Sequence, residues 1–113
     1  MTTESRIKQE KKQQMTEDIK ALFDTLDDVR LYTMRPAIEK IVRLHFPRTR
    51  EIFIYYVGVY ALALYDVYKM ELKQEKDARL LKVLKNTEKD IDKFISEYKL
   101  SQFDLTQSTD LPF

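Results

Sequence analysis

Residues 52–65 have the sequence IFIYYVGVYALALY, fourteen positions without a charged side chain. Such a run is typical of a buried helix, a buried strand or part of a membrane span. A span needs about 20 apolar residues, whereas Glu51 and Asp66 bound this run. Its β-branched and aromatic residues favour a strand, but Ala-Leu-Ala-Leu at 61–64 is strongly helix-forming, and no turn residue follows to end a strand. The run therefore predicts a helix.

A helix that is apolar on all sides must be enclosed by other protein surfaces. In a chain of 113 residues, the enclosing surfaces are the other helices or a second copy of the chain. Gly58 is the only glycine, and inside a helix it costs about 1 kcal/mol relative to alanine. Either another helix crosses closely there, with Ala61 extending the small surface, or a well-buried helix tolerates it.

The composition is that of a small helical protein. Hydrophobic residues make up 43% and charged residues 35% of the chain, and one glycine with three prolines is too few turn residues for an all-β fold. Cysteine is absent, so disulfides are excluded, and the first residues lack the apolar core of a signal peptide. We expect one all-α domain, a small bundle around the 52–65 helix, in an intracellular (cytoplasmic) protein.

Polar residues at both ends divide the chain into three parts. Residues 1–14 predict a flexible N-terminal arm, residues 15–100 a helical domain, and residues 101–113 an extended tail. Within the domain, Thr16 is placed to cap a first helix that ends near Arg30. Pro36 fits the first turn of a second helix that Pro47 ends.

The long helix is expected to begin at Thr49, which can cap it. Residues 73–79 are almost wholly polar, so the helix either extends into solvent or bends there. Asn86 and Thr87 predict a further helix boundary. A last helix is expected to end near Lys99.

The most suggestive polar cluster surrounds Pro47. Residues 15–33 hold two bases against five acids, whereas residues 34–50 hold five bases against one acid. Arginines beside a helix N-terminus make a sound anion site. One interpretation is contact with a nucleic-acid backbone or an acidic patch on a partner, and the other is neutralisation of the acidic first helix. The candidate residues are Arg43, His45, Arg48 and Arg50.

The tail, SQFDLTQSTDLPF, holds two acids, no base and several large apolar side chains. These side chains either dock on the protein's own bundle or form a peptide ligand for another protein. The tail loosely resembles peptides that bind replication sliding clamps, which combine a glutamine, an aliphatic residue and an aromatic. The match is incomplete, because Thr106 stands where Gln102 would require an aromatic, and Leu111 lies one position too far from Gln107. The candidate partner-binding residues are Phe103, Leu105, Gln107, Leu111 and Phe113.

Residues for common catalytic and cofactor chemistry are missing. The chain has no cysteine, one histidine without a recognisable partner, and no glycine-rich phosphate loop. Asp24 and Asp28 are one helical turn apart and could share a divalent ion, but no third ligand has suitable spacing. Five tyrosines favour core packing with hydroxyls at its edge over stacking on bases; they are Tyr55, Tyr56, Tyr60, Tyr65 and Tyr68. We expect neither enzyme activity, nor a cofactor, nor a metal.

These features favour a non-enzymatic interaction or adaptor subunit that acts through its helix faces and through the Leu-Pro-Phe end of the tail. Its partner would be another protein, a second copy of the chain, or both, with no membrane involved. The alternative is a nucleic-acid-associated subunit of a larger complex that uses Arg43, Arg48 and Arg50.

Overall fold

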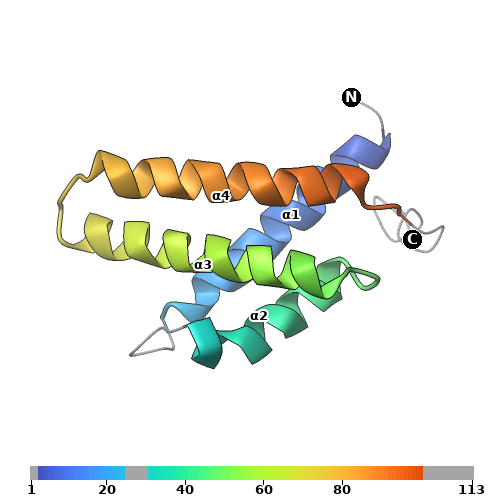
Figure 1. Cartoon of the computed structure of the whole chain (residues 1–113), viewed down its shortest axis with the longest axis horizontal. Helices are drawn as coiled ribbons and strands as arrows, with labels where there is room; N and C mark the ends of the chain where they lie inside the picture. The colour runs from blue at the N-terminus through green and yellow to red at the C-terminus, as the bar shows by residue number, and fades with distance from the viewer. Residues whose placement is uncertain (1–2, 25–30, 101–113) are drawn as a thin grey trace, which may run out of the picture.

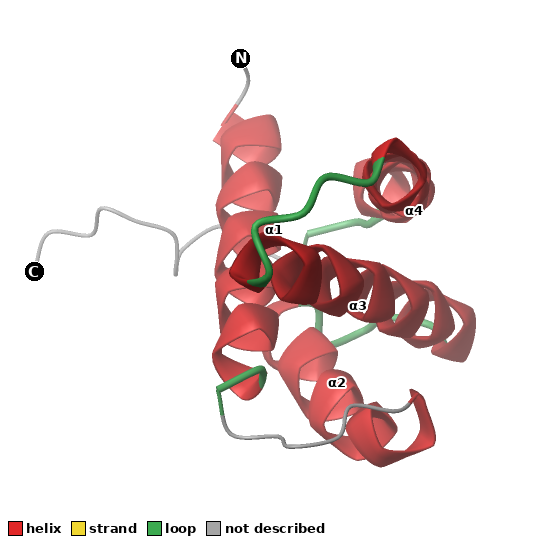
Figure 2. Cartoon of the chain, turned by 90° about the vertical axis from the view of Figure 1, so that its left-hand side faces the viewer, coloured by secondary structure: helices red, strands yellow, loops and turns green. Residues whose placement is uncertain are grey.

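The computed structural model describes residues 3–24 and 31–100, with side chains from Met34 onward in the second segment. These residues form four helices and no strand: α1 (Thr3–Leu22), α2 (Leu31–His45), α3 (Glu51–Leu72) and α4 (Ala78–Glu97). α3 and α4 lie side by side and antiparallel, α2 packs against α3, and α1 crosses behind them (Figure 1). In Figure 2, α2, α3 and α4 all lie on the same side of α1. The predicted all-α bundle is confirmed.

α3 is the central helix, as the uncharged run predicted, and it contacts each of the other helices. Its outer face is the exception, because Ile52 and Tyr55 are 50% and 55% exposed. α3 is therefore enclosed on most of its circumference and not on all of it. By length and composition it is the one helix in the described segments that could cross a membrane, although half of its most apolar window is buried in the bundle. Its buried residues are Phe53, Ile54, Val57, Gly58, Tyr60, Ala61, Ala63, Leu64, Val67 and Met70.

Gly58 lies where α2 crosses α3. Together with Arg35 and Ile38 of α2 it lines a small cavity of about 90 Å³. A side chain at position 58 would project into a space that α2 partly covers. Gly58 therefore lies at a helix crossing, and the cavity beside it leaves room for a small side chain.

The flexible arm predicted for residues 1–14 is wrong for residues 3–14, which belong to α1. Ile7, the arm's apolar residue, is only 2% exposed and packs in the interior. Lysines hold this polar segment to its neighbours: Lys8 Nζ donates to the backbone oxygen of Ser96 at 3.0 Å, and Lys11 Nζ to that of His45 at 3.0 Å. One buried isoleucine, together with lysine contacts to residues far away in the sequence, thus orders the N-terminal half of α1.

Several predicted helix boundaries also differ. Thr16 lies inside α1, where it hydrogen-bonds Tyr60, so it caps nothing. α2 begins five residues before Pro36, because Met34 is buried at 1% exposure and anchors that first turn. The residue that precedes α3 is Arg50 and not Thr49, and it makes no side-chain cap. The stop at Pro47 is confirmed, since α2 ends at His45.

The polar stretch after α3 is a turn, which settles the choice between an extended and a bent helix. Gln74 has φ 57° there, and the Asp77 side chain accepts the backbone N–H of Arg79 at 2.9 Å and caps α4. That same bond lowers the pKa of Asp77. The predicted boundary at Asn86 and Thr87 is wrong, because α4 is continuous there and the Thr87 hydroxyl donates to the Leu84 carbonyl at 2.9 Å.

Candidate functional site

α3 begins and α4 ends at the same end of the bundle (Figure 1). The residues there line a cavity of about 400 Å³. We call it the aromatic pocket. Its position follows from the antiparallel pairing of α3 and α4, which brings the first turn of one beside the last turn of the other. The residues that line it are Phe46, Arg48, Thr49, Arg50, Phe53, Phe94, Ile95, Glu97, Tyr98 and Lys99.

Four aromatic rings form the apolar part of the pocket and hold one another in place. Phe46 meets Phe53 and Tyr98 edge to face, with ring centroids 5.6 and 5.0 Å apart, and Phe53 lies 5.6 Å from Phe94. Such pairs add about 0.5–1.5 kcal/mol each beyond the area they bury. Much of the surface of these rings is therefore used in contacts with one another.

Tyr98 carries an unsatisfied polar atom in this wall. Its hydroxyl is buried and has no hydrogen-bond partner within residues 3–24 and 31–100. A buried polar group without a partner costs about 1–3 kcal/mol. Most buried side-chain polar atoms in proteins are paired, so this hydroxyl is an unusual feature of the pocket.

Three cations and one carboxylate form the charged part of the lining. Arg48 Nη2 donates to the Lys99 carbonyl at 2.7 Å, and its guanidinium lies 6.0 Å from the Tyr98 ring centroid. Arg50 is exposed, and among the described residues no hydrogen bond or ion pair holds its guanidinium. Lys99 is exposed as well, while Glu97 supplies the single negative charge in the lining. The pocket thus combines an apolar interior with a net positive rim.

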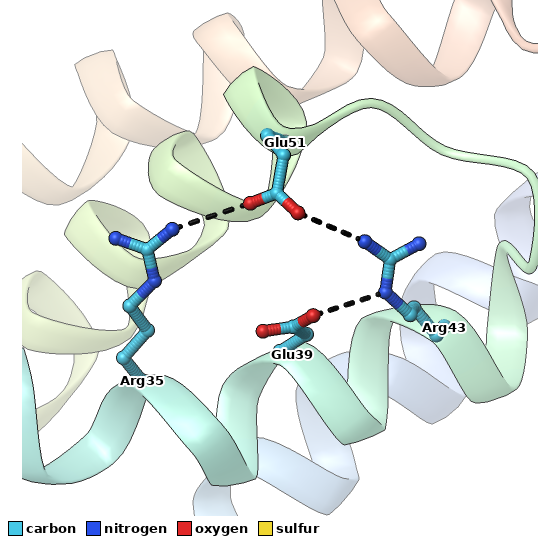
Figure 3. Close-up of polar contacts among 4 residues, drawn as sticks. All are labelled: Arg35, Glu39, Arg43 and Glu51. Carbon is cyan, nitrogen blue, oxygen red and sulfur yellow. Dashed lines mark hydrogen bonds and ion pairs between the residues drawn. The ribbon is translucent and has the colours of Figure 1, made fainter.

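The predicted basic cluster is divided by the structure. Arg48 and Arg50 line the aromatic pocket, but Arg43 faces the α2–α3 junction instead. There Arg43 Nε donates to Glu39 at 3.2 Å and its Nη2 to Glu51 at 3.1 Å, while Arg35 pairs with the other Glu51 oxygen at 3.2 Å (Figure 3). Arg43 therefore pairs with two carboxylates, and the structure does not bring it to the same place as Arg48 and Arg50.

His45 also lies outside the lining of the pocket. Its Nε2 lies 2.6 Å from Asp18 Oδ2, and only 12% of the His45 side chain is exposed. It joins α2 to the acidic face of α1.

The predicted tail residues Phe103, Leu105, Gln107, Leu111 and Phe113 lie outside the described residues, as does Asp28 of the candidate divalent-ion pair. Asp24 accepts a hydrogen bond from the Tyr68 hydroxyl at 3.3 Å. Within residues 3–24 and 31–100 no group of three or more acidic or histidine side chains is placed to hold a metal ion.

Sequence reasoning missed the contribution of α4 to the pocket, namely Phe94, Ile95, Glu97, Tyr98 and Lys99. A last helix ending near Lys99 was expected, but the prediction of a helix does not say which residues it contacts. The polar turn at residues 73–77 was the available signal, since a reversal there returns α4 along α3.

Comparison with known proteins adds no relative. No protein-family model matches the chain, and neither the curated proteins nor the solved structures that were searched contain a match.

Proposed function

We propose that this protein is a non-enzymatic interaction subunit that binds an acidic, aromatic-containing peptide segment of a protein partner in the aromatic pocket. The observation that supports this most directly is the combination of four aromatic rings with Arg48, Arg50 and Lys99 around one cavity. An apolar side chain of the peptide would fill the interior while a neighbouring carboxylate pairs with the rim.

The size and chemistry of the pocket suit one or two side chains. Ligand pockets usually measure about 300–1,000 Å³, and this one lies at the lower end of that range at about 400 Å³. Burial of one Phe or Leu side chain contributes about 1.5–3 kcal/mol. The exposed rim charges add mainly orientation and association rate, so we expect micromolar rather than nanomolar affinity.

The alternative function is nucleic-acid association within a larger complex, and Arg50, which is free to contact phosphate, favours it. Two features speak against it. The lining holds three cations beside Glu97, which is a short basic track for a phosphate backbone. The aromatic rings also pack edge to face on one another, which leaves little free surface for stacked bases.

The test begins with random 12-residue peptides displayed on phage and selected on the immobilised full chain. We expect the enriched peptides to combine Phe or Leu with Asp or Glu. Fluorescence anisotropy with a labelled selected peptide should then show a loss of affinity of about tenfold for Arg50→Glu, about 1.4 kcal/mol. Lys40→Glu makes the same charge change at an exposed position of α2 outside the pocket, and it should leave the affinity unchanged.

A labelled single-stranded 20-nucleotide DNA forms the second arm of this experiment. Binding that falls steeply with salt and is lost in Arg50→Glu would support the nucleic-acid alternative. Selected peptides without acidic or aromatic residues, or equal losses in the two charge variants, would contradict the proposed peptide site.

A further inference from the structure

The chain continues from the edge of the aromatic pocket into a segment whose chemistry matches the pocket. α4 ends at Glu97, and the next two residues, Tyr98 and Lys99, both line the cavity. Residues 101–113 follow, and their sequence, SQFDLTQSTDLPF, lies outside the described residues. It contains two acids, no base, and Phe103 directly before Asp104.

Charge complementarity favours this segment as an occupant. The lining carries Arg48, Arg50 and Lys99 against Glu97, so a negative segment is attracted to it. Asp104 and Asp110 supply that charge without an opposing base. The apolar interior at the same time needs a large side chain, which Phe103 provides next to Asp104.

The length of chain needed is also available. Phe103 lies three positions beyond Leu100, and three residues span at most about 10 Å. Because a short tether holds the segment at an effective concentration on the order of millimolar, even weak intrinsic binding would fill the pocket.

We propose that the protein's own residues 101–113 occupy the aromatic pocket, with Phe103 in the apolar interior and Asp104 against Arg48 and Arg50. This inference rests on the proposed function, because it names the segment that occupies the pocket before a partner peptide binds. A partner peptide must displace the tail, so its apparent affinity is reduced by the fraction of molecules with an open pocket.

The experiment uses full-length chains and a fluorescein-labelled synthetic peptide with the sequence of residues 101–113. Wild-type protein should bind the labelled peptide weakly, because its own tail competes. Phe103→Ala in the full-length chain should bind it about tenfold more tightly. Ser108→Ala, a polar change in the same tail, should behave as wild type, and a labelled peptide that carries Phe103→Ala should not bind. Far-ultraviolet circular dichroism checks that every variant keeps its helices.

A second measurement does not depend on added peptide. The ring of Phe103 should shift the methyl resonances of Ile95, so the carbon-proton spectra of wild type and Phe103→Ala should differ at Ile95. The same comparison for Ile38, which lies at the α2–α3 crossing, should show no difference.

Equal affinity of wild type and Phe103→Ala for the labelled tail, or an unchanged Ile95 resonance, overturns the proposed intramolecular contact. If a phage-selected peptide still binds both proteins equally in that case, the proposed function stands and only the tail inference falls. If neither peptide binds any of the folded proteins, both proposals fall.

Discussion

The hydroxyl of Tyr98 is a buried polar atom that the described part of the fold leaves without a partner. Other buried or half-buried polar groups are paired across helices: the Tyr60 hydroxyl bonds Thr16, and His45 meets Asp18 at 2.6 Å. Individual polar contacts therefore decide how the helices are set against one another, and two of them allow direct tests.

Tyr98→Phe removes the unsatisfied hydroxyl and keeps the ring that packs on Phe46. We expect the free energy of unfolding to rise by about 1 kcal/mol, because the cost of desolvating the hydroxyl is removed. Urea denaturation measures this change. Tyr55→Phe, at a side chain that is 55% exposed, is the matched control and should change nothing. A clear loss of stability in Tyr98→Phe would show that the hydroxyl has a partner among residues not described here.

Lys12 joins α1 to α4 through Glu88 and Asp92, each at 2.8 Å. Burial lowers the pKa of Lys12, but the hydrogen bonds and charges of Asp92 and Glu88 outweigh it, and the pKa is raised above its ordinary 10.5. A base with a raised folded pKa stabilises the protein fully below its unfolded pKa and loses this effect as the pH rises through the folded pKa. The stabilisation is thus complete below pH 10.5 and declines above it.

Lys12→Met keeps most of the aliphatic stem and removes the charge. At pH 8 we expect a loss of about 1 kcal/mol in unfolding free energy, a small value because both carboxylates are partly exposed. Urea titrations from neutral to strongly alkaline pH should show the difference between wild type and variant shrinking above pH 10.5. Lys20→Met, on the exposed face of α1, should show no such pH-dependent difference. A gap that stays constant across this range would contradict the assigned role of the ion pairs.

At the scale of the element, α3 is positioned mainly by apolar burial, whereas α1 depends to a larger extent on polar contacts. α3 buries residues along most of its circumference, so its position follows from its apolar content. Within its bounds α1 buries only Ile7, Met15 and Ile19. Lys8, Lys11 and Lys12, which lie between the first two of these, bind groups on α2 and α4. The two helices should therefore respond differently to substitution.

Ile7→Ala tests whether the first turns of α1 belong to the core. Removal of a buried isoleucine side chain should lower the unfolding free energy by about 2–4 kcal/mol, whereas the same change in a flexible arm would have no effect. Gln9→Ala, two residues away and exposed, is the control. Thermal melting followed by circular dichroism measures both variants. Equal melting temperatures for Ile7→Ala and wild type would restore the flexible-arm interpretation.

Gly58→Ala tests the crossing of α2 over α3. Alanine raises helix propensity by about 1 kcal/mol, and the cavity of about 90 Å³ beside Gly58 has room for a methyl group. We expect a gain of about 0.5–1 kcal/mol by urea denaturation. Gly58→Leu should instead destabilise the protein by about 1–3 kcal/mol, because a larger side chain overfills the space. If Gly58→Ala is destabilising too, the helices approach too closely for any side chain.

At the scale of the whole molecule, α3 buries much of its apolar surface against the other helices, and this bears on its likeness to a membrane span. Full-length protein mixed with vesicles of phosphatidylcholine and phosphatidylglycerol should stay at the bottom of a flotation gradient. The reason is that insertion of α3 would require separation of α1, α2 and α4 from it. Recovery of the protein with the floating vesicles would contradict this prediction.

The sequence predicted those parts of the molecule that local chemistry determines. An uncharged run identified α3, and Pro47 located the end of α2. The helix over residues 3–14 was not predictable in this way, because its anchors, such as the contact of Lys8 with Ser96, join residues far apart in the chain. The same limit applied to the candidate site. Proximity in sequence grouped Arg43 with Arg48 and Arg50, whereas the turn after α3 brings Phe94, Tyr98 and Lys99 to the latter two.

α1 begins and α4 ends on the same side of the bundle, where Lys8 reaches Ser96 across 88 positions of sequence. A fluorescent protein that replaces the residues after Leu100 would be tethered beside the aromatic pocket, which Tyr98 and Lys99 line, and would crowd whatever binds there. The turn at residues 73–77 lies at the opposite end (Figure 1). Its exposed backbone makes it the better place to insert a reporter, a choice that decides whether a binding assay observes the pocket or its own label.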